Sequence, residues 1–160
     1  MKRALVIGCP GSGKSTFARR LRERTGLPLV YLDRLYWNPD RTAVSRDEFD
    51  RRLREVLRQD RWIIDGNYAR TLEARLARCD TVFFLDYPAE VCLIGIADRR
   101  GIPREDMPWV ETAEDPAFTV FVRDFQDEVR PQIIQCLGRA EGVKIHRFAS
   151  RADADRYFMT

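Results

Sequence analysis

One short segment constrains this chain more than any other feature of it. Residues 8–15 read G-C-P-G-S-G-K-S, a complete G-x-x-x-x-G-K-S motif, and the apolar run 4–7 precedes it. The residues after the motif, 16–21, favour a helix. An apolar strand, a glycine-rich loop and a helix in this order form the setting that a phosphate-binding loop requires. The motif therefore predicts a turn whose backbone N–H groups converge on phosphate, helped by the positive end of the helix dipole.

The residue types inside the loop point to a nucleoside triphosphate with a metal ion. Lys14 is expected to reach the β- and γ-phosphates, and the Ser15 hydroxyl is expected to hold Mg²⁺. The predicted cofactors are therefore ATP and Mg²⁺. The alternative, a glycine-rich turn that binds nothing, is disfavoured because the motif is complete and correctly flanked. The predicted nucleotide-binding residues are Gly8, Pro10, Gly11, Ser12, Gly13, Lys14, Ser15 and Thr16.

Length and cysteine usage bound the class of protein. A chain of 160 residues suits one domain, residues 1–160, and its apolar runs are strand-sized, too short to cross a membrane. A strand is predicted almost from the first residue, which leaves no room for a signal peptide. The four cysteines are widely spaced, and His146 is the only histidine. We therefore expect free thiols in a cytoplasmic protein, and neither a disulfide framework nor a zinc site.

The charged residues are mostly arginine and acid. The net charge is +3, and only three of the 28 basic residues are lysines. Arginine binds phosphate through two parallel hydrogen bonds, which would suit a phosphotransferase. A general preference for arginine explains most of them better, because many alternate with acids on predicted helix faces. No basic stripe interleaved with aromatic residues is present, so nucleic-acid binding has little support, and no membrane partner is expected.

Strand and helix signals alternate along the chain. Besides 4–7, apolar runs predict strands at 29–32, 62–64, 81–85 and 143–146, and several are apolar throughout. Helical patterns follow the capping boxes at 45–48 and 150–153, and others cover 70–76, 90–100 and 118–133, the last kinked at Pro131. This order predicts an α/β P-loop NTPase fold, a five-stranded parallel sheet with helices on both faces. Residues 101–116 are rich in proline, glycine and acids, and they predict a short lid, mobile until ATP binds.

Three acids fall where predicted strands end, beside the loop that begins at Gly8. Asp33, Asp65 and Asp86 each follow an apolar strand, and the carboxyl ends of parallel strands meet in one crevice. Asp86 ends an apolar strand as a Walker B acid does, so we expect it to orient Mg²⁺ directly or through water. The alternative for Asp86 is a carboxylate that caps the next helix.

Several segments resemble P-loop kinases of the adenylate kinase group. Residues 65–71, D-G-N-Y-A-R-T, resemble that group's D-G-F-P-R-T with one residue inserted, and 86–88 resemble its D-x-P strand end. Segments 31–37, 62–72 and 80–88 are also similar to those of the small kinase-like ATPases called DNA topology modulation proteins, a name that records a genetic effect. The resemblance runs in the right order from the loop to residue 100 and is weaker afterwards.

The resemblance implies roles for residues outside the loop. Arg70 would bind the phosphate of the acceptor, and Arg99 would be a lid arginine. The two families usually have an arginine where Gly95 stands, which in adenylate kinases contacts the donor nucleotide, so Arg99 or a later arginine would have to replace it. The fold would place the adenine beside Ala149.

Two further arginines are candidates by spacing. Arg123 and Arg130 lie seven residues apart on one predicted helix face, from which they would close over the γ-phosphate. The alternative is a solvated helix face.

Asp33 has three open interpretations. It would serve as the base for a hydroxyl acceptor, as a ligand of the acceptor, or as a structural partner of Arg34 or Arg70. The neighbouring Tyr36 and Trp37 would stack on a base or sugar, or pack in the core. The chain is thus predicted to transfer the γ-phosphate of MgATP to a nucleotide or small hydroxylated acceptor. The alternative is an ATP-binding regulatory or nucleic-acid-associated module with weak ATPase activity.

Overall fold

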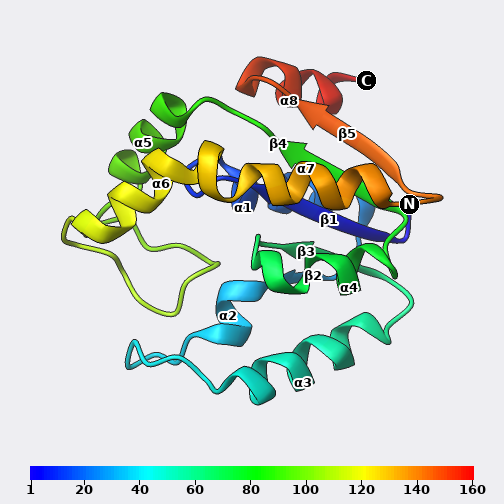
Figure 1. Cartoon of the computed structure of the whole chain (residues 1–160), viewed down its shortest axis with the longest axis horizontal. Helices are drawn as coiled ribbons and strands as arrows, with labels where there is room; N and C mark the ends of the chain where they lie inside the picture. The colour runs from blue at the N-terminus through cyan, green and yellow to red at the C-terminus, as the bar shows by residue number, and fades with distance from the viewer.

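Five strands pair into one parallel sheet in the computed structural model, which describes all 160 residues (Figure 1). The strand order is β2-β3-β1-β4-β5, and every pair is parallel. This confirms the predicted five-stranded parallel sheet. The strands are β1 (Arg3–Gly8), β2 (Leu29–Tyr31), β3 (Trp62–Asp65), β4 (Thr81–Leu85) and β5 (Lys144–Phe148).

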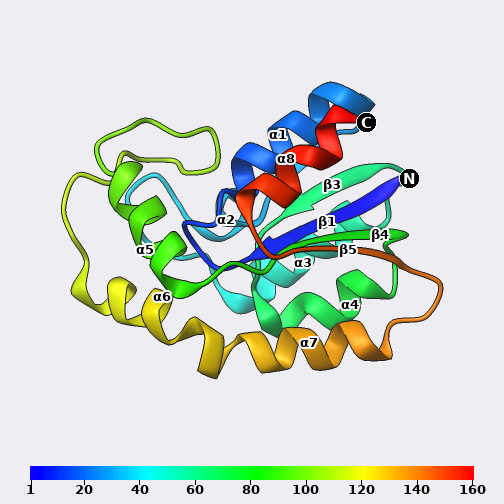
Figure 2. The ribbon, with the colours of Figure 1, turned by 90° about the horizontal axis from the view of Figure 1, so that it is seen from above.

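Helices cover both faces of the sheet (Figure 2). Helices α1 (Lys14–Thr25) and α8 (Arg151–Met159) lie together on one face, and α4 (Leu72–Leu76) and α7 (Arg130–Arg139) lie on the other. The remaining helices are α2 (Leu32–Tyr36), α3 (Arg46–Leu57), the 3₁₀ turn η1 (Ala69–Thr71), α5 (Ala89–Asp98) and α6 (Pro116–Glu128). No helix combines the length and the apolar character needed to span a bilayer.

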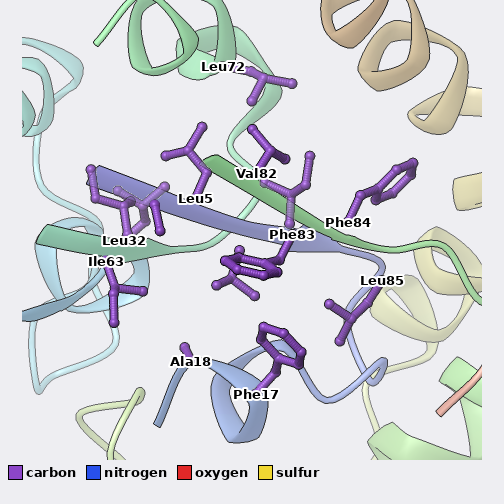
Figure 3. Packing of buried hydrophobic residues seen from close by; sticks show 14 of the residues in the cluster. Leu5, Phe17, Ala18, Leu32, Ile63, Leu72, Val82, Phe83, Phe84 and Leu85 are labelled. Atoms are coloured by element: carbon purple, nitrogen blue, oxygen red, sulfur yellow. The ribbon is translucent and has the colours of Figure 1, made fainter. Parts of the chain in front are cut away.

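The core fills the space between the sheet and these two helical layers. All residues of β3 and β4 are buried, as expected for parallel strands covered on both faces. On one face Phe83 of β4 meets Phe17 of α1, with ring centres 5.1 Å apart. On the other face Leu5 and Val82 point toward Leu72 of α4 (Figure 3). This double-sided core fixes the central strands and hence the loops at their carboxyl ends.

The register brings the predicted phosphate loop beside the end of β3. Val6 of β1 lies opposite Asp65 of β3, and Gly8 lies opposite Leu85 of β4. Helices α5 and α6 and the long segment between them gather at the same end of the sheet (Figure 1). The loop after β1 therefore faces the segment that was predicted to be a lid.

Two elements differ from the sequence prediction. The expected helix over 118–133 divides at Val129, so α6 ends at Glu128 and α7 begins at Arg130, with Pro131 in its first turn, where a missing N–H costs nothing. Strand β2 ends at Tyr31, and Asp33 lies in the first turn of α2 rather than at a strand end. Both capping boxes are present: the Ser45 Oγ accepts from the Glu48 N–H at 3.1 Å, and the Ser150 Oγ accepts from the Asp153 N–H at 3.2 Å.

Candidate functional site

The loop between β1 and α1 has the backbone shape of a phosphate-binding loop. Gly11 and Gly13 have positive φ angles of 86° and 92°, which favour glycine, and α1 begins at Lys14 immediately afterwards. Asn67, which follows β3, holds the start of the loop: the Gly8 N–H donates to its Oδ1 at 3.0 Å, and its Nδ2 donates to the Gly8 carbonyl. Asn67 was not among the predicted site residues, since an amide side chain two residues after a strand carries no specific signal.

Gly95 is explained by the closeness of α5 to the loop. A Cβ atom on Gly95 would lie 2.0 Å from the carbonyl oxygen of Gly11, and one on Gly11 would lie 2.1 Å from the carbonyl oxygen of Cys92. The two backbones therefore touch at a pair of glycines, and no side chain fits between them. An arginine at position 95 would therefore not fit this packing of α5 on the phosphate loop.

Arg151 fixes the opposite side of the loop. Its guanidinium donates to the carbonyls of Gly11 at 3.0 Å and Ser12 at 3.1 Å from the first residue of α8. These two contacts tie the start of α8 to the loop. The adjacent Ala149, predicted to lie beside the adenine, is exposed and precedes Arg151 at the end of β5. This contact of Arg151 with the loop was not predicted from the sequence, because Arg151 lies outside the phosphate-loop motif.

The carboxylate beside Ser15 is Asp65, and Asp86 lies elsewhere. The Ser15 Oγ donates to Asp65 Oδ2 at 2.5 Å, and Asp65 is only 4% exposed, with no hydrogen-bond partner for its Oδ1. Burial raises the pKa of Asp65 to about 6, against the opposing effects of the Lys14 charge and the Ser15 hydroxyl. A buried carboxylate oxygen without a partner, next to a hydroxyl and a lysine, is suited to a hard cation such as Mg²⁺.

Asp86 is paired with two arginines, so its expected role toward Mg²⁺ stays a prediction that these contacts do not support. Arg130 Nε donates to Asp86 Oδ1 at 2.7 Å, and Arg147 Nη2 lies 2.7 Å from Oδ2. Burial works to raise the pKa of Asp86, but these two partners outweigh it and hold the pKa below its ordinary value. Asp86 joins β4 to α7 and β5, and it neither caps α5 nor lies next to Ser15.

Asp33 lies in the same cleft as Lys14, Ser15 and Asp65, which has a volume of about 820 Å³. The Tyr68 hydroxyl donates to Asp33 Oδ1 at 2.6 Å. Burial raises the pKa of Asp33, and the Tyr68 hydrogen bond and the Lys14 charge partly oppose that shift. Neither Arg34 nor Arg70 contacts it, since Arg34 binds backbone carbonyls and Arg70 binds Asp50, so the structural pair, one of the three interpretations of Asp33, is not formed.

The loop that carries Asn67 and Tyr68 is held by a buried arginine. Arg75 of α4 is fully buried and donates to the Gly66 carbonyl at 3.0 Å and to the Asn67 carbonyl. Burial lowers the pKa of Arg75 to about 9. Arg75 thereby positions both the amide that supports Gly8 and the phenol that contacts Asp33.

Three of the predicted arginines lie outside the cleft. Arg70 makes two bonds to Asp50 of α3, at 2.7 and 3.2 Å, and it is directed away from the cleft residues. Arg130 binds Asp86, and the exposed Arg123 contacts the neighbouring Asp124 at 3.2 Å. None of the three lines the cleft that contains Lys14, and each contacts an acid, so their roles toward phosphate stay predictions.

Arg99 does line the cleft. It is half-buried at the end of α5, and its Nε has no hydrogen-bond partner and lies 3.9 Å from the Glu111 carboxylate. Arg100 and Arg104 also line the cleft, and Arg104 lies 3.2 Å from Glu111 and 3.7 Å from Asp106. Of the predicted arginines outside the loop, Arg99 is the one that the fold brings to Lys14.

The predicted lid is docked by polar contacts. Glu105 binds Arg22 of α1 at 3.1 Å and the Tyr31 hydroxyl of β2. Arg34 of α2 donates to the carbonyls of Glu105 at 2.8 Å and Met107 at 3.0 Å. Residues 101–116 contain few apolar anchors, but two arginines, from α1 and α2, and a tyrosine hydroxyl from β2 hold this segment beside the cleft.

Comparisons with known proteins agree with this fold. No protein-family model matches the chain. It is 30% identical over 90 residues to the adenylate kinase of Thermotoga maritima and 29% identical over 90 residues to that of Thermotoga neapolitana. Each match covers 54% of this chain and 40% of the adenylate kinase, so the chain spans less than half of those relatives.

Two solved structures share the whole architecture. The shikimate kinase of Acinetobacter baumannii, solved with shikimate, superposes with a TM-score of 0.64 at 17% identity, covering 99% of this chain and 90% of that one. The shikimate kinase of Bacteroides thetaiotaomicron gives 0.65 at 16% identity, covering 99% and 94%. The chain therefore has the P-loop NTPase fold of these kinases.

Proposed function

We propose that this protein is a kinase that transfers the γ-phosphoryl group of MgATP to a hydroxyl group of a small acceptor. The observation that carries the proposal is the position of the Asp33 carboxylate in one cleft with Lys14 and Ser15, without an arginine partner. The adenylate kinases and shikimate kinases that resemble the chain are phosphotransferases by name, which supports the same class of reaction.

The donor end fits MgATP on the residues present. Backbone N–H groups of the glycine loop and of the first turn of α1, together with Lys14, would hold the β- and γ-phosphates. Ser15 and the unpartnered oxygen of Asp65 would hold the metal ion, whose charge would offset that of the phosphates. Arg99, with its unpartnered Nε, would stabilise the charge on the transferred group.

The acceptor end supplies a base. Because the Tyr68 hydroxyl occupies Asp33 Oδ1, Oδ2 is left to accept the proton of an acceptor hydroxyl. The acceptor oxygen then bonds to the γ-phosphorus, the bond from that phosphorus to the bridging β-γ oxygen breaks, and ADP leaves. A raised pKa makes Asp33 a stronger base than an exposed aspartate, while it remains ionised above that pKa.

A monophosphate acceptor is disfavoured by Arg70. A phosphate already present as an anion needs a cation in the acceptor site and no base. Arg70, which would bind that phosphate by resemblance, is engaged by Asp50 outside the cleft. The hydroxyl acceptor therefore accounts for more of the side-chain arrangement.

The test is acceptor-dependent formation of ADP. Purified protein with MgATP is screened against small hydroxylated compounds and nucleoside monophosphates, and ADP is followed above the rate without acceptor. We expect at least one hydroxylated acceptor to raise the rate well above that of hydrolysis, and the Lys14→Met variant to abolish the increase. ATP binding without acceptor-dependent turnover, together with a partner bound only in the presence of ATP, would instead favour a regulatory module.

A further inference from the structure

The acceptor end of the cleft contains two carboxylates, Asp33 and Asp106, whose partners leave them able to accept further hydrogen bonds. Asp33 has no cationic partner, and Asp106 is 4% exposed with no hydrogen-bond partner for its Oδ1. Both residues line the cleft. A buried carboxylate oxygen without a donor is unfavourable, so a bound molecule that brings a donor to it would be stabilised there.

The inner cations at this end are already paired. Arg104 forms ion pairs with Glu111 and Asp106, and Arg34 donates hydrogen bonds to two backbone carbonyls of the docked segment. Arg41 and Arg100 also line the cleft, but both are exposed, so water screens their charges. Arg99 is the remaining half-buried cation of the cleft, and the proposed function assigns it to the transferred phosphoryl group. With Arg99 so engaged, an anionic acceptor group placed beside Asp33 and Asp106 would meet two carboxylates with no further half-buried cation to offset them.

Aromatic surfaces form the rim of the same region. The half-buried Trp37, after α2, and Trp109, in the docked segment, make an edge-to-face contact with ring centres 5.5 Å apart. Both tryptophans line the cleft, and the Arg41 guanidinium lies 5.8 Å from the centre of the Trp109 ring. Such flat apolar surfaces pack against the face of a ring, including the C–H face of a sugar or cyclitol.

We infer that the acceptor is an uncharged, ring-shaped polyol, such as a nucleoside or a sugar, and that acceptors carrying a carboxylate or phosphate are rejected. This inference rests on the proposed function. One ring hydroxyl donates to Asp33 and receives the phosphoryl group, with its proton passing to Asp33 and ADP leaving. A second hydroxyl donates to Asp106 Oδ1, and the ring face packs on Trp37 and Trp109.

Matched acceptor pairs test the inference. Adenosine is compared with its 5′-monophosphate, and glucose with glucuronate, so that each pair keeps its ring and differs mainly by an anionic group. Binding is measured by quenching of tryptophan fluorescence, which is informative because Trp37 and Trp109 line the cleft while Trp62 is buried in the core. Transfer is measured by ADP formation and by mass spectrometry of the product.

We expect the uncharged member of at least one pair to bind about 10-fold more tightly than its anionic partner, and to be phosphorylated. The adenosine and glucose arms distinguish a nucleoside from a sugar. Tighter binding of the anionic members would overturn the inference, whereas their phosphorylation would leave the kinase function standing. Binding of an uncharged member without phosphoryl transfer would uphold the inference about the cleft and contradict the proposed kinase function.

A substitution at Asp106 gives an independent readout. Asp106→Asn keeps the shape and one acceptor oxygen but removes the charge that repels anions. We expect the preference for the uncharged member, as a ratio of binding constants, to fall about 10-fold. Asp127→Asn makes the same change on the exposed face of α6, outside the cleft, and should leave the ratio unchanged. An unchanged ratio in Asp106→Asn would contradict the role of this carboxylate.

Discussion

The donor and acceptor ends of the cleft are built in different ways. The phosphate loop of the donor end is one continuous segment, from Gly8 to Thr16, held in shape by its glycine contact with α5 and by the side chains of Asn67 and Arg151. The acceptor end is assembled from side chains of α2, the loop after β3 and the docked segment 101–116. A binding loop formed by one continuous segment can be recognised in the sequence as a motif. Side chains brought together from separate segments leave no such motif, and each can be substituted independently, which would change the specificity.

The largest effect is expected at the donor end. Lys14→Met removes the cation opposite the triphosphate and keeps the length of the side chain. We expect acceptor-dependent kcat/KM to fall by about 10³-fold, as for the loss of a principal charge-stabilising group. Circular dichroism and thermal melting would show that the variant remains folded. A folded Lys14→Met protein with wild-type transfer would refute the assignment of the donor end.

Asp65→Asn is expected to have opposite effects on stability and on catalysis. Because its pKa is raised to about 6, Asp65 contributes stability that is present below its ordinary value of 3.8 and is lost as pH rises through about 6. At pH 8 without Mg²⁺, the variant should therefore be more stable than wild type by on the order of 2 kcal/mol. Its transfer rate and its response to Mg²⁺ should both fall sharply.

The check on Asp65 is a pair of melting curves with and without Mg²⁺ at pH 8. Wild type should gain stability from the metal ion, and Asp65→Asn should gain much less. An equal gain in both proteins would place the metal ion away from Asp65.

Gly95→Ala tests whether α5 shapes the phosphate loop. The added Cβ would collide with the Gly11 carbonyl, so the loop or the helix must shift, at a cost of about 1–3 kcal/mol. ATP affinity, measured by calorimetry, should fall about 10-fold. Gly138→Ala is the matched control, because a Cβ there meets nothing within 4 Å and should stabilise α7 by up to about 1 kcal/mol. Unchanged ATP affinity in Gly95→Ala would show that this contact is incidental.

The smallest effect is expected in the docked segment. Glu105→Gln weakens the bonds to Arg22 and Tyr31, so amide hydrogen exchange across 101–115 should rise by a few-fold in the absence of nucleotide. A non-hydrolysable ATP analogue should restore much of the protection. Glu23→Gln, on the exposed face of α1, should have no effect. Equal exchange in Glu105→Gln and wild type would mean that other contacts hold the segment.

The sheet and the donor loop were predictable because their signals are local. The apolar strands and the complete motif at 8–15 depend on neighbouring residues, and the structure confirms the five-stranded parallel sheet. Pro131 predicted an interruption of the helix near Val129, because proline inside a continuous helix loses a backbone N–H hydrogen bond.

The acid and arginine roles were not predictable in the same way. Asp65 and Asp86 both follow apolar strands, and only the strand order, with β3 beside β1, brings Asp65 to Ser15. Arg70 has the right sequence context for an acceptor ligand, yet Asp50, 20 residues earlier, takes its guanidinium. Arg151 and Arg75 bind carbonyls, and such contacts have no sequence pattern because every residue offers a carbonyl.

The measurement that tests the account most directly is kcat for Asp33→Asn beside Arg70→Ala, over a range of pH, with the acceptor that the screen identifies. A hydroxyl acceptor predicts a loss of about 10²- to 10⁴-fold in Asp33→Asn. It also predicts that wild-type kcat falls as pH drops through the raised pKa of Asp33, and that the variant lacks this dependence. Arg70→Ala should stay close to wild type. A severe loss in Arg70→Ala with near-normal turnover in Asp33→Asn would contradict the account and assign the acceptor as a monophosphate.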